Sequence, residues 1–249
     1  PWKNINYDNV KFFTGTCNTI EASLAENEYT GNDDSTVLLL HFNDKGEIKK
    51  DNELFQFIID KSTAGIDKNR YKFGGGAALF YKTTDTINLR FKEPNFFTNF
   101  LDIGAFSFEM WLHPFSRKDG EVVLEKFGII YESNNVKRHS GIRLRFTKGM
   151  LVWEFINIFQ SPGFGNKYTT VRISSKSVIP LYKWAHHSLS FNPVNGKLTY
   201  YINGSAVSSV FCTDTEQPDD TILSGIFNEY EYGMLTIGKK YKGLIDEFI

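Results

Sequence analysis

The segment FSFEMWLHP, residues 106–114, alternates between apolar and polar side chains with a period of two. One face carries Phe106, Phe108, Met110 and Leu112, and the other carries Ser107, Glu109, Trp111 and His113. Successive side chains of a β-strand point to opposite faces, so this period predicts a strand with one buried face. Such a strand needs a second layer to cover its apolar side.

Turn signals elsewhere predict that strands of this kind pair as hairpins. Residues 189–211 contain two expected hairpins, which turn at Asn195-Gly196 and Asn203-Gly204. Asn-Gly supplies the positive φ angles that type I′ turns require. Residues 141–156 form a third, with its turn at Lys148-Gly149. No segment of about 12 residues shows a helical period, and the 23 Phe and 12 Tyr residues favour sheets. We therefore expect an all-β fold.

The first 36 residues differ in composition from the rest of the chain. They are rich in Asn, Asp, Glu and Thr, and only Val10–Phe13 reads as a strand. We expect residues 1–36 to form an N-terminal extension that packs on one domain, residues 37–249. The two cysteines, Cys17 and Cys212, allow either one long-range disulfide or two free thiols.

Several separated motifs together resemble a known family. They are VLLLHFN at 37–43, FGGGAALFYKTTDTINL at 73–89, FSFEMWLHP at 106–114, KWAHHSLSFNPVNGKLTYYINGSAV at 183–207, LTIG at 235–238 and GLIDEFI at 243–249. In this order they resemble the laminin-G-like domains of the concanavalin A-like lectin/glucanase superfamily. The resemblance implies a jelly-roll sandwich of two antiparallel sheets over residues 37–249. It also implies a secreted, periplasmic or cell-surface protein.

Some residues of these motifs carry specific structural expectations. Gly74-Gly75-Gly76 would give the backbone freedom where another segment passes closely, and Trp184 would fill the core at a strand start. The resemblance implies that His186 is a core histidine. Strand alternation puts Asp246 and Glu247 on opposite faces, so one acid points inward. We expect that acid to accept backbone N–H bonds; the alternative is a metal ligand.

The sequence predicts no catalytic activity. Glucanases of the superfamily carry alternating acids in an E-x-D-x-E strand, and no such triplet occurs here. Glu121 and Glu125 would lie about 13 Å apart along a strand, whereas retaining glycosidases need about 5 Å between their carboxyl groups. No G-x-S-x-G nucleophile motif is present.

Calcium is the metal that the resemblance makes most plausible, because family members often hold Ca²⁺ after the Gly-rich strand. Here the usual phrase has become FYKTTDTINL, with Lys82 where an acid is expected. Asp85 is the ligand that would survive, and hard oxygen donors suit Ca²⁺. We expect no tight calcium site and no other cofactor.

The charge pattern argues against two classes of partner. The formal net charge is −1, and no apolar run approaches the about 20 residues of a membrane helix. We therefore expect no nucleic-acid partner and no membrane span. A local basic region combines residues 137–139 with Arg143 and Arg145. It is either a solvated edge or a docking patch for an acidic partner.

Aromatic residues in expected loops give the functional hypothesis. The candidate partner-binding rings are Phe96, Phe97, Phe159, Phe164, Tyr168, Tyr230 and Tyr232. Loop rings either fold back as small cores or anchor a partner. We expect a non-catalytic recognition module that binds a protein or glycan partner through such rings. The alternative is an architectural subunit that contacts neighbouring subunits of a surface or periplasmic assembly, such as a filament or sheath, and a glycan hydrolase is the third class.

Overall fold

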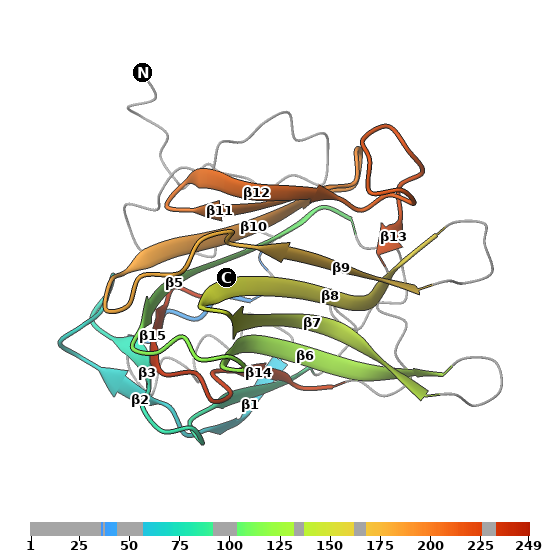
Figure 1. Ribbon diagram of the computed structural model, residues 1–249. Helices are drawn as coiled ribbons and strands as arrows, with labels where there is room; N and C mark the ends of the chain where they lie inside the picture. The colour runs from blue at the N-terminus through green and yellow to red at the C-terminus, as the bar shows by residue number, and fades with distance from the viewer. Residues whose placement is uncertain are drawn as a thin grey trace.

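The computed structural model describes residues 36, 38–43, 57–91, 104–131, 137–161, 168–225 and 233–249. These residues form fifteen β-strands in two sheets (Figure 1). Every pairing between these strands is antiparallel. No helix long and apolar enough to cross a membrane occurs in the described ranges.

One sheet has seven strands. In spatial order they are β12 (Ser205–Phe211), β11 (Lys197–Ile202), β10 (Ala185–Asn192), β5 (Phe106–Pro114), β15 (Gly243–Asp246), β3 (Ala77–Phe80) and β2 (Gly65–Asp67). The two hairpins predicted within residues 189–211 are therefore confirmed, and they join the consecutive strands β10, β11 and β12.

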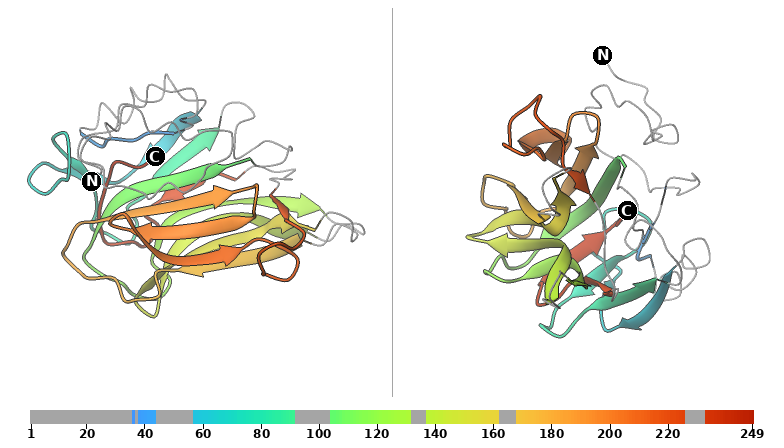
Figure 2. Two further views of the ribbon diagram at one scale, coloured as in Figure 1. Left: turned by 90° about the horizontal axis from the view of Figure 1, so that it is seen from above. Right: turned by 90° about the vertical axis from the view of Figure 1, so that its right-hand side faces the viewer.

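The other sheet has eight strands. In spatial order they are β1 (Phe57–Ser62), β4 (Ile87–Phe91), β14 (Leu235–Ile237), β6 (Val122–Tyr131), β7 (Lys137–Thr147), β8 (Met150–Gln160) and β13 (Ser224–Gly225), and β9 (Tyr168–Ser174) also pairs with β8. In the left view of Figure 2, the strand axes of β10–β12 in the first sheet are roughly aligned with those of β6–β9 in the second. The predicted sandwich of two antiparallel sheets is confirmed, and aligned packing of this kind is common in sandwiches.

The core lies between the two sheets. The alternation in β5 holds, since Phe108, Met110 and Leu112 are buried in the core and Phe106 packs against it. From the other sheet, β7 and β8 contribute further core residues, which are Ile142, Leu144, Phe146, Leu151, Trp153 and Phe155. Burial of large apolar side chains at about 25 cal/mol per Å² makes this layer the main source of stability.

The turns follow the predicted chemistry with one difference. Lys148-Gly149 and Asn203-Gly204 have positive φ at both residues, as type I′ turns require. At the first Asn-Gly pair only Gly196 has a positive φ, 66°. The reason is the register: Asn192 pairs with Lys197, so the connection has four residues rather than two.

Two expectations for motif residues have different outcomes. Asp246 accepts backbone N–H bonds from Lys72 and Phe73, as predicted for one of the two acids, but it shares the outer face of the sheet with its cross-strand partner Trp111. Trp184 is half-buried outside the core, because its ring packs on His113, whose side chain lies on the outer face of β5. The expectation that Trp184 fills the core is therefore wrong.

The resemblance implies that His186 is a core histidine, but the ring that points into the core is that of its neighbour His187. His186 is buried but pairs with Trp111 on the outer face of the seven-stranded sheet. His187 pairs with Met110, so its ring points into the core. The core histidine is His187, and its Nδ1 lies 2.7 Å from the hydroxyl of Tyr200.

The segment 38–43 joins the core although no named strand contains it. Leu38, Leu40 and Phe42 are core residues, and Leu40 bridges to Phe248. Residues 1–35 lie outside the described ranges. They hold most of the predicted extension, including its Val10–Phe13 strand and Cys17. Cys212 is a buried free thiol.

Gly76 shows why the glycine run precedes β3. A Cβ atom at Gly76 would lie 2.7 Å from the backbone oxygen of Asn43 and 2.9 Å from that of Phe42. The segment 38–43 therefore passes too close for any side chain at this position.

We predict that Gly76→Ala lowers the free energy of unfolding by about 1–3 kcal/mol, because the added methyl group must displace backbone atoms. Gly75→Ala is the matched control, since nothing lies within 4 Å of its added Cβ, and it should change stability by at most about 0.5 kcal/mol. Urea unfolding monitored by Trp fluorescence measures both. Equal losses in the two variants would show that segment 38–43 does not press on Gly76.

Candidate functional site

The aromatic residues proposed from sequence divide into three groups. Phe159 lies in β8 and is fully buried in the core. Tyr168 begins β9 and is half-buried. Phe96, Phe97, Phe164, Tyr230 and Tyr232 lie outside the described residues.

The prediction that Phe159 is presented to a partner is wrong. Strand β8 continues to Gln160, so Phe159 pairs with Thr169 of β9 and with Gly225 of β13. Asn157 has a φ of 53°, which interrupts the alternation, and Ile158 and Phe159 are both core residues. A bulge of this kind re-aims the side chains that follow it.

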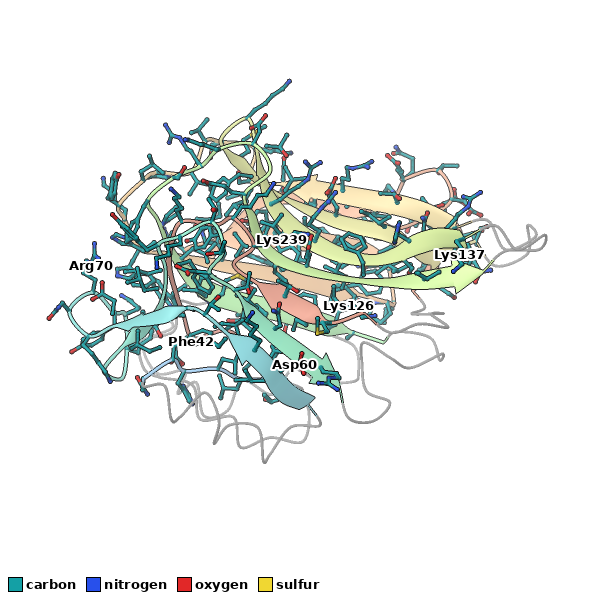
Figure 3. The ribbon with its side chains drawn as sticks, turned by 90° about the horizontal axis from the view of Figure 1, so that it is seen from below. Phe42, Asp60, Arg70, Lys126, Lys137 and Lys239 are labelled. Carbon is teal, nitrogen blue, oxygen red and sulfur yellow. The ribbon has the colours of Figure 1, made fainter. Side chains whose placement is uncertain are left out.

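The strand ends that bracket the remaining predicted rings lie together. Gln160 pairs with Tyr168, Tyr131 pairs with Lys137, and Leu235 pairs with Leu89 of β4. Six strands therefore start or stop at one end of the eight-stranded sheet, the end at which Lys137 is labelled in Figure 3. They are β4, β6, β7, β8, β9 and β14. The topology brings together the anchors of the segments that carry the predicted rings.

The opposite end of the sandwich carries an aromatic surface that the sequence analysis missed. Phe115 follows β5, and its ring stacks on Tyr182 at 5.9 Å with an interplanar angle of 18°. The guanidinium of Arg70 lies 5.0 Å from the centre of the Phe115 ring. Asp67 holds that guanidinium through Oδ2, 2.9 Å from Nε and 2.8 Å from Nη2.

Tyr81 belongs to the same end. Gly243 of β15 pairs with both Phe80 and Pro114, so those two residues lie two strand spacings, about 10 Å, apart. Tyr81 and Phe115 directly follow them. Tyr81 is 70% exposed and Tyr182 is 65% exposed. We call Arg70, Tyr81, Phe115 and Tyr182 the Tyr182 rim; Figure 3 places Arg70 far from Lys137, at the other end of the molecule.

Beside the rim, the rings continue onto the outer face of the seven-stranded sheet. His113 packs on Phe115 at 5.5 Å and on Trp184 at 5.2 Å. Burial lowers the pKa of His113 from its ordinary value, so the ring is neutral at pH 7. Lys72 lies 4.3 Å above the ring of Trp111. Aromatic and cationic groups here support one another by stacking and cation–π attraction.

Two acidic side chains on that outer face, Asp246 and Glu109, are buried. The Asp246 carboxylate accepts N–H bonds from Lys72, Phe73 and Glu247, at 2.7, 3.1 and 3.0 Å. Burial raises the pKa of Asp246 to about 7 despite these bonds. Glu109 and His186 form a buried pair, with Oε2 and Nε2 3.2 Å apart. These carboxyl groups fasten loops and strands of the seven-stranded sheet.

The outer face of the eight-stranded sheet carries a row of polar side chains. Direct cross-strand partners share a face, and the row runs through Arg172, Glu154, Arg143, Glu125, Thr236, Asn88 and Lys61. Within this row Glu154 is buried and accepts hydrogen bonds from Arg143, Arg145 and Arg172. The predicted basic region on β7 therefore includes two arginines that share one carboxylate.

The pKa of Glu154 reports the strength of this cluster. Burial alone would raise the pKa, but the hydrogen bonds from Arg145, Arg143 and Arg172 outweigh it and hold the value at about 2. Glu154 is therefore ionised at any physiological pH.

Asp85 has a structural role in the turn between β3 and β4. Its Oδ2 accepts N–H bonds from Tyr81 at 2.9 Å and Lys82 at 2.7 Å. Within the described ranges no three His, Cys, Asp or Glu side chains gather in a way that could hold a metal ion. A calcium ion at Asp85 would have to draw its other ligands from backbone carbonyls, amides or residues outside those ranges.

Two nucleophile or base candidates are locked in the interior. Burial raises the pKa of the Cys212 thiol to about 12, so the reactive thiolate is scarce at neutral pH. Burial lowers the pKa of His187 to about 3, and its ring is fully enclosed between the sheets. Neither group is accessible to a substrate.

Comparison with known proteins locates the chain among sandwich proteins. The family model described as the concanavalin A-like lectin/glucanases superfamily matches residues 83–248. No curated protein matches the chain.

Three solved structures illustrate the likeness. Domain 4 of AbnA, a GH43 extracellular arabinanase from Geobacillus stearothermophilus, is 19% identical, with a TM-score of 0.44; the match covers 76% of this chain and 74% of that one. The botulinum neurotoxin serotype D binding domain is 17% identical with a TM-score of 0.49, covering 86% of this chain and 47% of that one. The endo-β-1,4-glucuronan lyase from Trichoderma reesei is 7% identical with a TM-score of 0.48, covering 77% and 88%. All three scores lie below 0.5, so nothing about this chain's ligand follows from them.

We predict that Phe159→Ala lowers the free energy of unfolding by about 3–5 kcal/mol, because it leaves a cavity in the core. Tyr168→Ala, its neighbour across the β8–β9 pair, is half-buried and should cost less. Urea titration with linear extrapolation measures both values. A loss below about 1 kcal/mol for Phe159→Ala would mean that the ring is not core.

We predict a pH-dependent loss of stability that Glu154→Gln removes. The folded-state pKa of about 2 lies below the ordinary 4.5, so the contribution of Glu154 is present above pH 4.5 and is lost as the pH falls towards 2. Because the arginines are partly exposed, we expect the wild type to lose about 2 kcal/mol more than Glu154→Gln between these limits. Glu125→Gln, which removes a carboxylate paired with Lys239, is the control and should keep the wild-type profile.

Proposed function

The chain belongs to the concanavalin A-like lectin/glucanases superfamily, and from this premise we propose that it is a non-catalytic recognition module. Its partner is a glycan or a protein in an extracellular or cell-envelope setting, which is the setting that the laminin-G-like resemblance implies. The observation that carries the proposal is the Tyr182 rim, because it presents aromatic rings to solvent from a rigid sandwich.

The rim has the physical properties of a contact surface. The Tyr182 ring has one face on Phe115, so its 65% exposed area lies on the other face and the edge. Exposed rings provide a large apolar contact area with a polar hydroxyl at the tip. Arg70 adds donors held in place by Asp67. Because stacking and the ion pair fix these side chains in advance, a partner would order little on binding.

The rings predicted from the sequence remain a second candidate for partner contact. Phe96, Phe97, Phe164, Tyr230 and Tyr232 belong to segments anchored at the Lys137 end of the eight-stranded sheet, and Tyr168 starts β9 there. Their support is the sequence pattern together with the shared position of the bracketing strand ends.

The non-catalytic part of the proposal has separate support. Three buried acids are engaged in structural bonds: Asp246 with backbone N–H groups, Glu154 with arginines and Asp85 in a turn. Glycoside cleavage instead needs two carboxyl groups facing a sugar. We further propose that recognition does not require calcium, because Lys82 stands where the family phrase carries an acid.

We predict that the double variant Tyr81→Ala/Tyr182→Ala keeps its thermal midpoint but binds a glycan array at least tenfold more weakly, about 1.4 kcal/mol. Stability should be unchanged because both rings are mostly exposed. Val194→Ala is the matched control, since Val194 is 62% exposed in the β10–β11 turn. Binding of the wild type should be equal with and without a calcium chelator.

Each other outcome reassigns the site or the function. Undiminished glycan binding by the double variant would move the site to the Phe96–Tyr232 surface at the other end. If instead the wild type self-associates and the double variant does not, the chain is an architectural subunit. Release of reducing sugars from any bound glycan would contradict the non-catalytic proposal.

A further inference from the structure

Five connections between strands meet at the end of the sandwich that carries the Tyr182 rim. They are residues 81–86, 115–121, 148–149, 175–184 and 238–242. The backbone N–H of Phe115 donates to the Lys242 carbonyl at 2.9 Å, and that of Ile179 donates to the Gly149 carbonyl at 3.0 Å. The Arg117 guanidinium also donates to the Ile179 carbonyl, at 2.6 Å. The charges of these connections therefore act together at one end of the molecule.

These five connections are strongly basic. They contain nine Lys and Arg residues against three Asp and Glu residues, a surplus of six positive charges. We call the nine cationic residues the basic end; they are Lys82, Arg117, Lys118, Lys148, Lys176, Lys183, Lys239, Lys240 and Lys242. Because the whole chain has a net charge of −1, the rest of it carries −7. The nearly neutral total conceals two regions of opposite charge.

The acids of these connections bond to the backbone, whereas most of the cations face solvent. Asp85 and Glu121 are buried, and both accept backbone N–H bonds. Asp119 accepts the backbone N–H that begins the β7–β8 turn, at 2.6 Å. Seven of the nine residues of the basic end are exposed, and of these Lys239 pairs with Glu125. The fold uses the acids to build its turns and leaves a positive surface.

An exposed apolar side chain lies among these lysines. Val178 is 50% exposed, and it packs over the β7–β8 turn, since a Cβ atom at Gly149 would lie 3.2 Å from Val178 Cγ1. Lys148 precedes that glycine, and Lys176 lies two residues before Val178. Lys118 belongs to the connection that bonds to the same turn. Lysines from three connections therefore surround one apolar contact point.

The residue type of the cations indicates a partner with many mobile charges. Eight of the nine are lysines, whose ammonium groups are point charges on flexible stems. Arginine recognises paired oxygens bidentately, but Arg117 of the basic end already donates to the Ile179 carbonyl. Lysine clusters attract anionic lipid surfaces without fixed geometry, and exposed apolar side chains enter the head-group region. A nucleic acid would satisfy the charge but offers Val178 no apolar region.

We propose that the basic end docks on the surface of an anionic phospholipid bilayer, with Val178 in the head-group region and the lysines against the lipid phosphates. The contact is peripheral, and it acts within about 8 Å because salt screens charges beyond this distance. This inference goes beyond the proposed function and does not depend on it, since a lipid head group is neither the glycan nor the protein partner of the Tyr182 rim.

The test measures co-sedimentation of the protein with lipid vesicles. The probes are vesicles of phosphatidylcholine mixed with phosphatidylglycerol or with phosphatidylserine, and phosphatidylcholine alone is the blank. The variant Lys118→Gln/Lys148→Gln/Lys176→Gln removes three exposed charges around Val178. The variant Val178→Ser removes the apolar contact and keeps the charges.

The matched control removes the same number of charges at the opposite end of the sandwich. It is Lys137→Gln/Arg138→Gln/Lys197→Gln, at the starts of β7 and β11. Thermal midpoints verify that each variant is folded.

We expect the wild type and the control to bind both kinds of anionic vesicle and not phosphatidylcholine alone. The basic-end triple variant should bind at least tenfold more weakly, and raised salt should release the wild type. Val178→Ser should weaken binding by about threefold at every salt concentration, because it changes only apolar burial.

Other results would contradict the proposal. The proposal is wrong if the wild type binds none of the vesicles, or binds phosphatidylcholine as tightly as the anionic mixtures. Equal losses in the control and the basic-end triple variant would make total charge the cause. Tighter binding to a DNA duplex than to the vesicles, at equal phosphate concentration, would assign the surface to nucleic acid. Because the vesicles carry no sugar, these results are independent of glycan binding by the Tyr182 rim.

Discussion

The other features of this molecule depend on the contact between the inner faces of its two sheets. Phe108 of β5 and Trp153 of β8 place their ring centres 5.2 Å apart, and Phe106 lies 5.8 Å from Phe155. Because strand side chains alternate, committing Trp153 and Phe155 to the core directs Glu154 to the outer face. The buried rings thus decide where the charged groups of β7, β8 and β9 can meet.

Local rules predict much of this fold. Alternation predicts the inner face of residues 106–114, and the two-residue turn at Lys148-Gly149 determines the register of β7 and β8. That register places Arg143 opposite Glu154, so this ion pair could have been found from sequence alone. The arrangement as a sandwich of two antiparallel sheets came from the resemblance, and the order of the strands was not predicted, since no local signal specifies which distant strands become neighbours.

The parts of the site that sequence reasoning missed depend on non-local geometry. Phe159 lies two residues after Asn157, whose left-handed backbone shifts the alternation. Asn tolerates this conformation, but one Asn within a strand pattern does not by itself predict a bulge. Arg172 reaches Glu154 only because β9 pairs with β8 across a long connection. Tyr182 and Arg70 meet at Phe115 although they lie far apart in sequence. In each case a tertiary contact gives the residue a role that its neighbours in sequence do not reveal.

Recognition at the Tyr182 rim depends on ring burial rather than on charge, and this has a consequence for binding. Ring burial is a hydrophobic contribution, which salt hardly weakens. Exposed charges are instead screened over about 8 Å at physiological salt. With a net charge of −1, the chain also has little long-range attraction for a charged partner. Binding at the rim therefore depends on the fit of the rings to the partner once the two are in contact.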